Sequence, residues 1–143
     1  MRYLLVDGHS VIFAWPELSK LHRHRTALAR DALVKLLTDY QDSSGMRVVV
    51  VFDGKGERNS EETTPGGIQV FYSAGDRSAD SVIERLVAKY GKEHDMTVVT
   101  NDHMEQQTVI SFGGLAISTD SLRELLDLEA KDLARRLKKH RRS

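Results

Sequence analysis

Four aspartates occupy positions from which they could act together in one chemical site. Asp7 and Asp53 each directly follow a run of apolar residues typical of a buried strand, and Asp102 lies just beyond another. Asp80 lies in the first turn of a predicted helix. In a parallel sheet the strands end, and the crossover helices begin, at one edge, called the rim below. All four carboxylates are therefore expected along the rim.

Clustered carboxylates repel one another, so a positive group is expected among them. The chain has no cysteine, which removes thiol catalysis, disulfides and cysteine-bound zinc. With oxygen ligands only, the expected ion is Mg²⁺ or Mn²⁺. Such a site suits hydrolysis of phosphodiester bonds, because the ion activates water and stabilises charge on phosphate oxygens. Walker A, GxGxxG, HExxH and GxSxG patterns are absent from the sequence.

Each acidic residue also has a structural interpretation. Asp7 and Asp102 suit helix caps, and Asp80 suits the positive end of a helix dipole. Glu84 follows Asp80 by one helical turn, so it either faces the same site or belongs to an ordinary helix surface. The joint placement of the four aspartates is what favours the metal site.

Apolar periodicity predicts the elements that would position these residues. Strands are expected at 3–6, 47–52, 68–72 and 96–100, with a short edge strand within 113–118. Helices are expected at 26–40, 78–91, 102–111 and 121–139. The alternation predicts an α/β fold in which helices cover both faces of a central, mainly parallel sheet. Residues 54–67 contain no apolar side chain and are predicted to form an exposed loop.

Composition places the chain among globular proteins. It has 143 residues, of which 40% are hydrophobic and 29% charged, and these values fit one domain spanning 1–143. No signal peptide and no apolar stretch of membrane-spanning length is evident, so a cytoplasmic protein with no membrane partner is expected.

The net charge of zero conceals a basic tail at residues 131–143. This segment holds seven lysines and arginines against one aspartate, so it carries +6 and the remainder carries −6. An acidic body with a basic tail suggests an anionic partner such as nucleic acid. A solvated helix end with cations near its C-terminus is the other interpretation.

The opening sequence YLLVDGHSVIFAWPEL resembles the DGYNxIxAWPxL pattern of YacP-like NYN domains, a branch of the PIN-like nucleases. The similarity continues in order through ARDALVKLLTDYQ, VVVVFDG, SADSVIERL, VVTNDHMEQ and LRELLDLEAKDLARRLKK. It implies a three-layer α/β/α PIN-like fold and a divalent-metal-dependent endoribonuclease. Because the branch includes a ribosome-associated nuclease that cuts mRNA, the expected partners are mRNA and the ribosome.

By this resemblance the family's acidic positions fall on the same four aspartates. Two departures concern the residues around them. The family's Tyr-Asn pair after Asp-Gly is His9 and Ser10 here, and Asn101 stands where serine is common. Ser10 is shorter than asparagine and has one fewer polar group, so Asn101 is expected to compensate in part. Both residues are expected to support the site.

RNA contact is expected through basic residues near the rim and in the basic tail, which would bind phosphates without reading sequence. The basic residues expected to contact RNA are Arg23, Arg25, Lys55, Arg58, Arg77, Arg135, Arg136, Lys138 and Lys139. Trp15 either stacks on a base or packs against the domain.

Two other functions are considered. One is an RNA- or ribosome-binding module with weak or no cleavage. The other is a receiver-like protein, but the paired acids expected after the first strand of a receiver are missing from this sequence.

Overall fold

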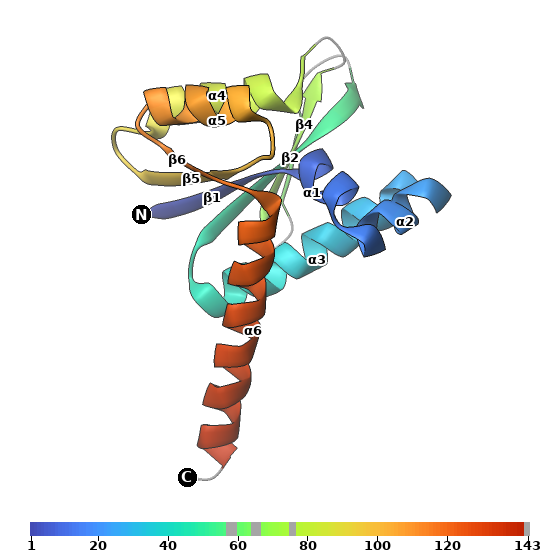
Figure 1. The fold of residues 1–143 in the computed structure, drawn as a ribbon, viewed down its shortest axis with the longest axis vertical. Helices are drawn as coiled ribbons and strands as arrows, with labels where there is room; N and C mark the ends of the chain where they lie inside the picture. Colours follow the sequence, from blue (N-terminus) through green and yellow to red (C-terminus); the bar gives the residue numbers. More distant parts are fainter. Residues whose placement is uncertain (57–59, 64–66, 75–76, 142–143) are drawn as a thin grey trace.

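The computed structural model describes residues 1–56, 60–63, 67–74 and 77–141. Six strands and six helices are found in these ranges (Figure 1). The strands are β1 (Arg2–Asp7), β2 (Arg47–Gly56), β3 (Ser60–Thr63), β4 (Gln69–Ala74), β5 (Asp95–Val99) and β6 (Leu115–Ile117). The helices are α1 (Gly8–Ala14), α2 (Pro16–His24), α3 (Thr26–Ser44), α4 (Ala79–Tyr90), α5 (His103–Ser111) and α6 (Thr119–Arg141).

The strands form one sheet in the order β3-β4-β2-β1-β5-β6. Five strands run parallel, and β3 pairs antiparallel with β4. The predicted α/β fold with a mainly parallel sheet is confirmed. From β1 the chain builds outward to β2 and β4, then returns to β5 on the other side of β1. Parallel sheets bind ligands where the strand order reverses in this way, which here is the rim end of β1 and β5.

Helices cover both faces of the sheet, giving three layers. Leu4 and Val6 of β1 point to the face covered by α1, α2, α3 and the start of α6. Leu5 points to the opposite face, where α4 and α5 pack (Figure 1). All three side chains are fully buried, as expected of a central parallel strand.

Two regions differ from the sequence expectation. Helices α1 and α2, which the sequence analysis did not assign, lie between β1 and α3 and are separated at Pro16. The loop predicted at 54–67 is wrong in part, because β2 continues through Gly56 and Ser60–Thr63 pairs with β4. Residues 57–59 and 64–66 of that prediction lie outside the described residues.

Close packing at Gly8 sets the position of the rim end of β1. Helix α1 starts at Gly8, directly after Asp7, and rests on the ring of Phe52 in the neighbouring strand. A Cβ atom on Gly8 would lie 2.3 Å from Phe52 Cε1, and Phe52 is fully buried. Glycine is therefore required where the backbone passes this ring.

Helix α6 begins against the body of the protein and its C-terminal half extends away from the sheet (Figure 1). Leu122 near its start is fully buried, whereas Leu133 and Leu137 are 37% and 54% exposed. The leucines of this helix are thus fully covered near its beginning and partly exposed farther along. Among the described residues, no helix has the combination of length and apolar character that a membrane span needs.

Candidate metal centre

Three carboxylates converge at the rim: Asp7, Asp80 and Glu105. They come from the end of β1, the first turn of α4 and the first turn of α5. One ligand oxygen from each lies within 4.8 Å of the other two. Oxygens on opposite sides of one Mg²⁺ are about 4.2 Å apart, given metal–oxygen distances of about 2.1 Å. Small side-chain adjustments would therefore bring the three onto one ion.

Glu105 is the most unusual member of this three-carboxylate cluster. It is only 2% exposed, and in the described part of the chain neither carboxylate oxygen has a hydrogen-bond partner. Burial, followed by the neighbouring Asp80, raises the pKa of Glu105 to about 9. A buried carboxylate without partners is costly unless it is protonated or binds a cation. The environment of Glu105 therefore fits a metal ligand.

Asp7 is buried as well, but one of its oxygens has a donor. The hydroxyl of Ser10 donates to Asp7 Oδ2 at 3.0 Å, and the residue is 6% exposed. Burial raises the pKa of Asp7 to about 6, the Ser10 hydrogen bond opposes the rise, and the nearby Asp80 adds to it. Ser10 thus holds the Asp7 carboxylate in place, in the supporting position expected for it.

Asp53 lies at the rim outside the three-carboxylate cluster. Its side chain is 56% exposed, and its Oδ1 accepts a 2.7 Å hydrogen bond from the backbone N–H of Ala79. That bond ties the end of β2 to the N-terminus of α4, one residue before Asp80. Asp53 therefore positions the helix that carries Asp80.

His9 packs beside Asp53. Its Nδ1 accepts a 3.3 Å hydrogen bond from the backbone N–H of Asp53 and lies 3.6 Å from Asp53 Oδ2. Burial lowers the pKa of His9, although Asp53 opposes this. A neutral imidazole is needed to accept at Nδ1, so the contact acts as a hydrogen bond more than as an ion pair.

Asp102 caps α5 and so positions Glu105. Its Oδ1 accepts hydrogen bonds from the backbone N–H groups of Met104 at 2.9 Å and Glu105 at 3.4 Å. The residue is exposed and lies outside the three-carboxylate cluster. Its second oxygen has no hydrogen-bond partner among the described residues.

Replacing Asp102 with alanine is expected to lower the free energy of unfolding by about 0.5–2 kcal/mol, the usual cost of losing a cap. Asparagine accepts the same backbone hydrogen bonds, so Asp102→Asn should retain most of the stability. Urea unfolding of the two variants measures the difference. Equal stability of Asp102→Ala and the wild type would contradict the capping role.

Asn101 and Glu84 do not join the three carboxylates. Asn101 donates from Nδ2 to Thr119 Oγ1 at 2.9 Å and accepts from the Thr119 backbone N–H at 3.0 Å. It therefore links the end of β5 to the start of α6 and supports the site only indirectly. Glu84 is half-buried on α4, one turn after Asp80, and lies outside the three-carboxylate cluster.

Glu105 is the site residue that the sequence analysis missed. It lies three residues after Asp102, a spacing that also suits a capping box, in which the glutamate would bond to the backbone. Its spacing of four from the buried Val109 was the available signal, because it places Glu105 on the inward face of α5.

The basic residues expected near the rim are partly described. Arg23 at the end of α2, Arg25 between α2 and α3, and Arg77 before α4 are exposed. The side chain of Lys55 and the whole of Arg58 lie outside the described residues. The three described arginines are available to phosphates.

In the basic tail, Arg135, Lys138 and Lys139 are exposed on the distal part of α6. Arg136 is held differently, because its Nη2 donates to Glu129 Oε1 at 3.0 Å. Arg135, Lys138 and Lys139 are therefore available to a phosphate backbone, whereas Arg136 is held by Glu129 of its own helix and by Ser43 of α3.

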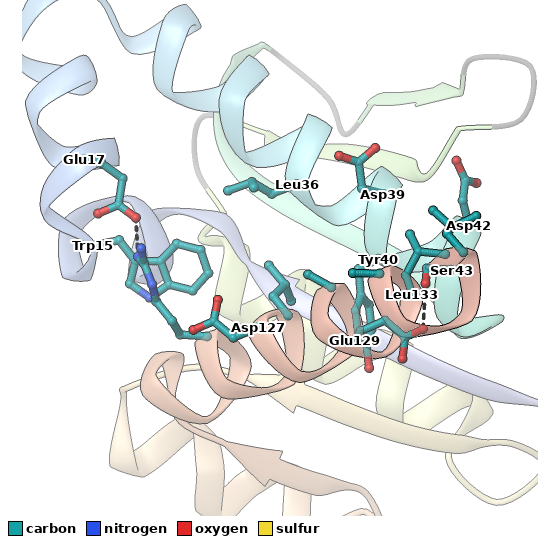
Figure 2. Close-up of a pocket in the computed structure, with 15 residues that line it drawn as sticks. Trp15, Glu17, Leu36, Asp39, Tyr40, Asp42, Ser43, Asp127, Glu129 and Leu133 are labelled. Atoms are coloured by element: carbon teal, nitrogen blue, oxygen red, sulfur yellow. Dashed lines mark hydrogen bonds and ion pairs between the residues drawn. The ribbon is translucent and has the colours of Figure 1, made fainter. Parts of the chain in front are cut away.

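A groove of about 760 Å³ runs between α3 and α6, and none of the three clustered carboxylates lines it. Figure 2 shows Trp15 and Glu17 at one end and Tyr40 and Leu133 farther along. Trp15 is only 3% exposed, and its Nε1 donates to the backbone oxygen of Thr119 at 3.3 Å. Trp15 therefore packs against the domain, and the base-stacking interpretation does not hold.

Comparison with known proteins adds the family context. The family model described as "YacP-like NYN domain" matches residues 4–143. The Bacillus subtilis (strain 168) protein named "Uncharacterized protein YacP" is 34% identical over 142 residues, covering 97% of this chain and 83% of that protein. The crystal structure of Rae1 (YacP) from Bacillus subtilis matches with a TM-score of 0.80 at 33% identity, covering 97% of this chain and 81% of that one. The structure of its W164L mutant matches with a TM-score of 0.82 at 30% identity, covering 99% and 84%.

Proposed function

The chain belongs to the YacP-like NYN domain family, and from this premise we propose that it is a divalent-metal-dependent endoribonuclease that hydrolyses RNA phosphodiester bonds. The family has a PIN-like nuclease fold, and this chain carries a cluster of acidic residues at the rim. The observation that carries the proposal is that one carboxylate oxygen from each of Asp7, Asp80 and Glu105 lies within 4.8 Å of the other two, with the Glu105 oxygens unpartnered among the described residues.

Asp7, Asp80 and Glu105 would hold Mg²⁺ or Mn²⁺, whose preferred ligands are carboxylate oxygens and water. When bound, such an ion lowers the pKa of a coordinated water and stabilises negative charge on the phosphate oxygens. Of the four aspartates first expected to bind the ion, Asp7 and Asp80 keep that role in the proposal. Asp53 and Asp102 act from farther out, through water or by positioning the ligands.

The supporting residues hold these ligands in a fixed arrangement. Ser10 orients Asp7 by donating to Oδ2, and Asp102 orients the first turn of α5, which carries Glu105. Asp53 anchors the start of α4, which carries Asp80. Outer contacts of this kind typically change metal affinity or activity by about 10- to 100-fold when they are removed.

Cleavage of a labelled single-stranded RNA in Mn²⁺ or Mg²⁺ tests the proposal. We expect cleavage by the wild type, loss of cleavage in EDTA, and a fall of at least about 100-fold in Asp80→Asn, because a direct ligand should matter as much as the strongest outer contact. Asp31→Asn, an exposed aspartate on α3, is the matched control and should cleave normally. Activity that survives both EDTA and Asp80→Asn would refute the proposal.

Binding of RNA without cleavage under any divalent metal would instead favour the RNA- or ribosome-binding module.

We also propose that residues 1–143 form one nuclease domain, that mRNA is the substrate class, and that the protein acts in the cytoplasm in association with the ribosome. Family membership supports these proposals. Co-sedimentation of the full chain with purified ribosomes, with and without high salt, tests the association.

The basic tail is expected to supply affinity without specificity. Substituting Arg135, Lys138 and Lys139 together with alanine should weaken binding to all single-stranded RNAs alike. Each lost phosphate contact lowers the slope of log affinity against log salt by about 0.7, so the slope should fall by about 2. Fluorescence anisotropy at several KCl concentrations measures this slope, and an unchanged slope would show that the tail does not touch RNA.

A further inference from the structure

Phe13 is a large aromatic side chain that the proposed reaction leaves without a role. It lies on α1, one helical turn after His9, and is 60% exposed. Phe13 lies six positions after Asp7, which corresponds to about 9 Å along a helix at about 1.5 Å per residue. An exposed phenylalanine thus lies on the short helix that begins directly after Asp7, one of the three clustered carboxylates.

Two histidine rings hold Phe13 in place. The Phe13 and His22 ring centroids are 5.1 Å apart with the planes at 87°, an edge-to-face contact between α1 and α2. The His9 ring centroid lies 5.8 Å from that of Phe13. Aromatic pairs at these separations are favourable, so the exposed ring keeps a defined orientation. A fixed ring loses less conformational entropy when it binds a flat partner.

The aromatic groups continue from Phe13 toward the metal centre. The His9 ring is 6.0 Å from the ring of Phe52, and the guanidinium of Arg30 lies 5.5 Å over the same Phe52 ring. Arg30 also donates from Nη2 to the backbone oxygen of Asp53 at 3.2 Å. Asp53 in turn bonds to the N-terminus of α4, beside Asp80. One connected row of side chains therefore leads from Phe13 to the rim.

We propose that Phe13, held between His9 and His22, is a stacking subsite for one unpaired base of an RNA whose backbone lies at the metal centre. This inference rests on the proposed function. Every base has a flat π face, so an aromatic platform beside a phosphate-binding centre suits single-stranded nucleic acid. A phenyl ring has no hydrogen-bonding group, so the subsite does not distinguish bases by their edges. An apolar protein segment is the competing occupant that the test must separate.

Anisotropy of a fluorescein-labelled, single-stranded RNA 12-mer in EDTA tests the subsite without cleavage. Stacking on an aromatic side chain is worth about 5- to 30-fold in affinity at its lower and middle range. We expect Phe13→Ala and Phe13→Leu both to weaken binding by about this factor, and Phe13→Trp to restore it. Leucine keeps the apolar character but loses the π face, so it separates stacking from a general apolar contact.

Phe112→Ala is the matched control, because Phe112 is 43% exposed and lies beyond the C-terminal end of α5, away from the rim. Its RNA affinity should equal that of the wild type. A set of RNAs, each with one abasic nucleotide at a different position, locates the stacked base. At one position the missing base should weaken RNA binding by the wild type by the same factor and leave RNA binding by Phe13→Ala unchanged. Full affinity in Phe13→Ala or Phe13→Leu, or no such position, would overturn the subsite.

The two proposals fail in different ways. RNA cleavage by the wild type that requires Asp80, with Phe13→Ala binding normally, would overturn only the stacking subsite. RNA binding that depends on Phe13, with no cleavage in Mn²⁺ or Mg²⁺, would support the subsite and overturn the nuclease. No measurable binding of single-stranded RNA by the wild type would overturn the subsite directly.

Discussion

Glu105→Gln is expected to abolish metal-dependent RNA cleavage and also to stabilise the metal-free protein at neutral pH. Glutamine has nearly the shape of glutamate but lacks the negative charge that a divalent cation needs. Because Glu105 would bind the ion directly, cleavage should fall by at least about 100-fold. Cleavage of labelled RNA in Mn²⁺ measures this loss.

The gain in stability follows from the buried position of Glu105. Its pKa rises from 4.5 to about 9, so at pH 7 the folded protein must take up a proton that the unfolded chain lacks. The uncharged amide of glutamine removes this requirement, which is worth about 1–3 kcal/mol at pH 7. Urea unfolding in EDTA measures the change in the free energy of unfolding.

Glu124→Gln is the matched control, since Glu124 is exposed on α6. It should leave both cleavage and stability unchanged. Wild-type cleavage by Glu105→Gln would exclude Glu105 as a ligand. A large loss of stability of Glu105→Gln in EDTA would contradict the destabilising effect assigned to the buried Glu105 carboxyl group.

Metal binding is expected to strengthen steeply with pH, because protons compete with the ion for Glu105 and Asp7. Both carboxyl groups have raised pKa values in the folded protein, about 9 and about 6. A carboxyl group whose pKa is higher in the folded protein than in the unfolded chain contributes most to the stability of the fold at acid pH, where the group is protonated. For Asp7 that contribution is lost between about pH 4 and 6, and for Glu105 between about pH 4.5 and 9. A divalent cation reverses the loss by displacing the protons.

Isothermal titration of Mn²⁺ at pH 6, 7 and 8 measures this coupling. One displaced proton, that of Glu105, predicts about a tenfold fall in Kd for each pH unit in this interval. Repeating the titrations in buffers of different ionisation enthalpy should show release of about one proton at pH 7. A Kd that does not change between pH 6 and 8 would mean that Glu105 is not a ligand.

The strands of this fold were predictable from the sequence, because a central parallel strand is apolar on both faces. The run 47–52 becomes the start of β2, and 3–6 becomes most of β1. Strand β3 was not predictable in this way. Its residues, Ser60–Thr63, are all polar, and only pairing with β4 makes them a strand.

The site was predictable where backbone topology alone determines position. Asp7 ends a strand and Asp80 opens a helix, so both reach the rim in any parallel sheet of this connectivity. Asp53 and Asp102 also reach it, but their side chains bond to backbone N–H groups at the helix starts. The direction of a side chain depends on packing against neighbouring elements, which the spacing of residues does not reveal.

The central claim is that Asp7, Asp80 and Glu105 together hold one divalent cation. The most direct test is a crystal of the protein soaked in Mn²⁺, with anomalous scattering used to locate the ion. We predict an anomalous peak at the rim, with an oxygen of each of the three carboxylates within about 2.0–2.4 Å of it. An ion located only away from the three carboxylates, or no anomalous peak at the rim at neutral or higher pH, would contradict the proposed metal centre.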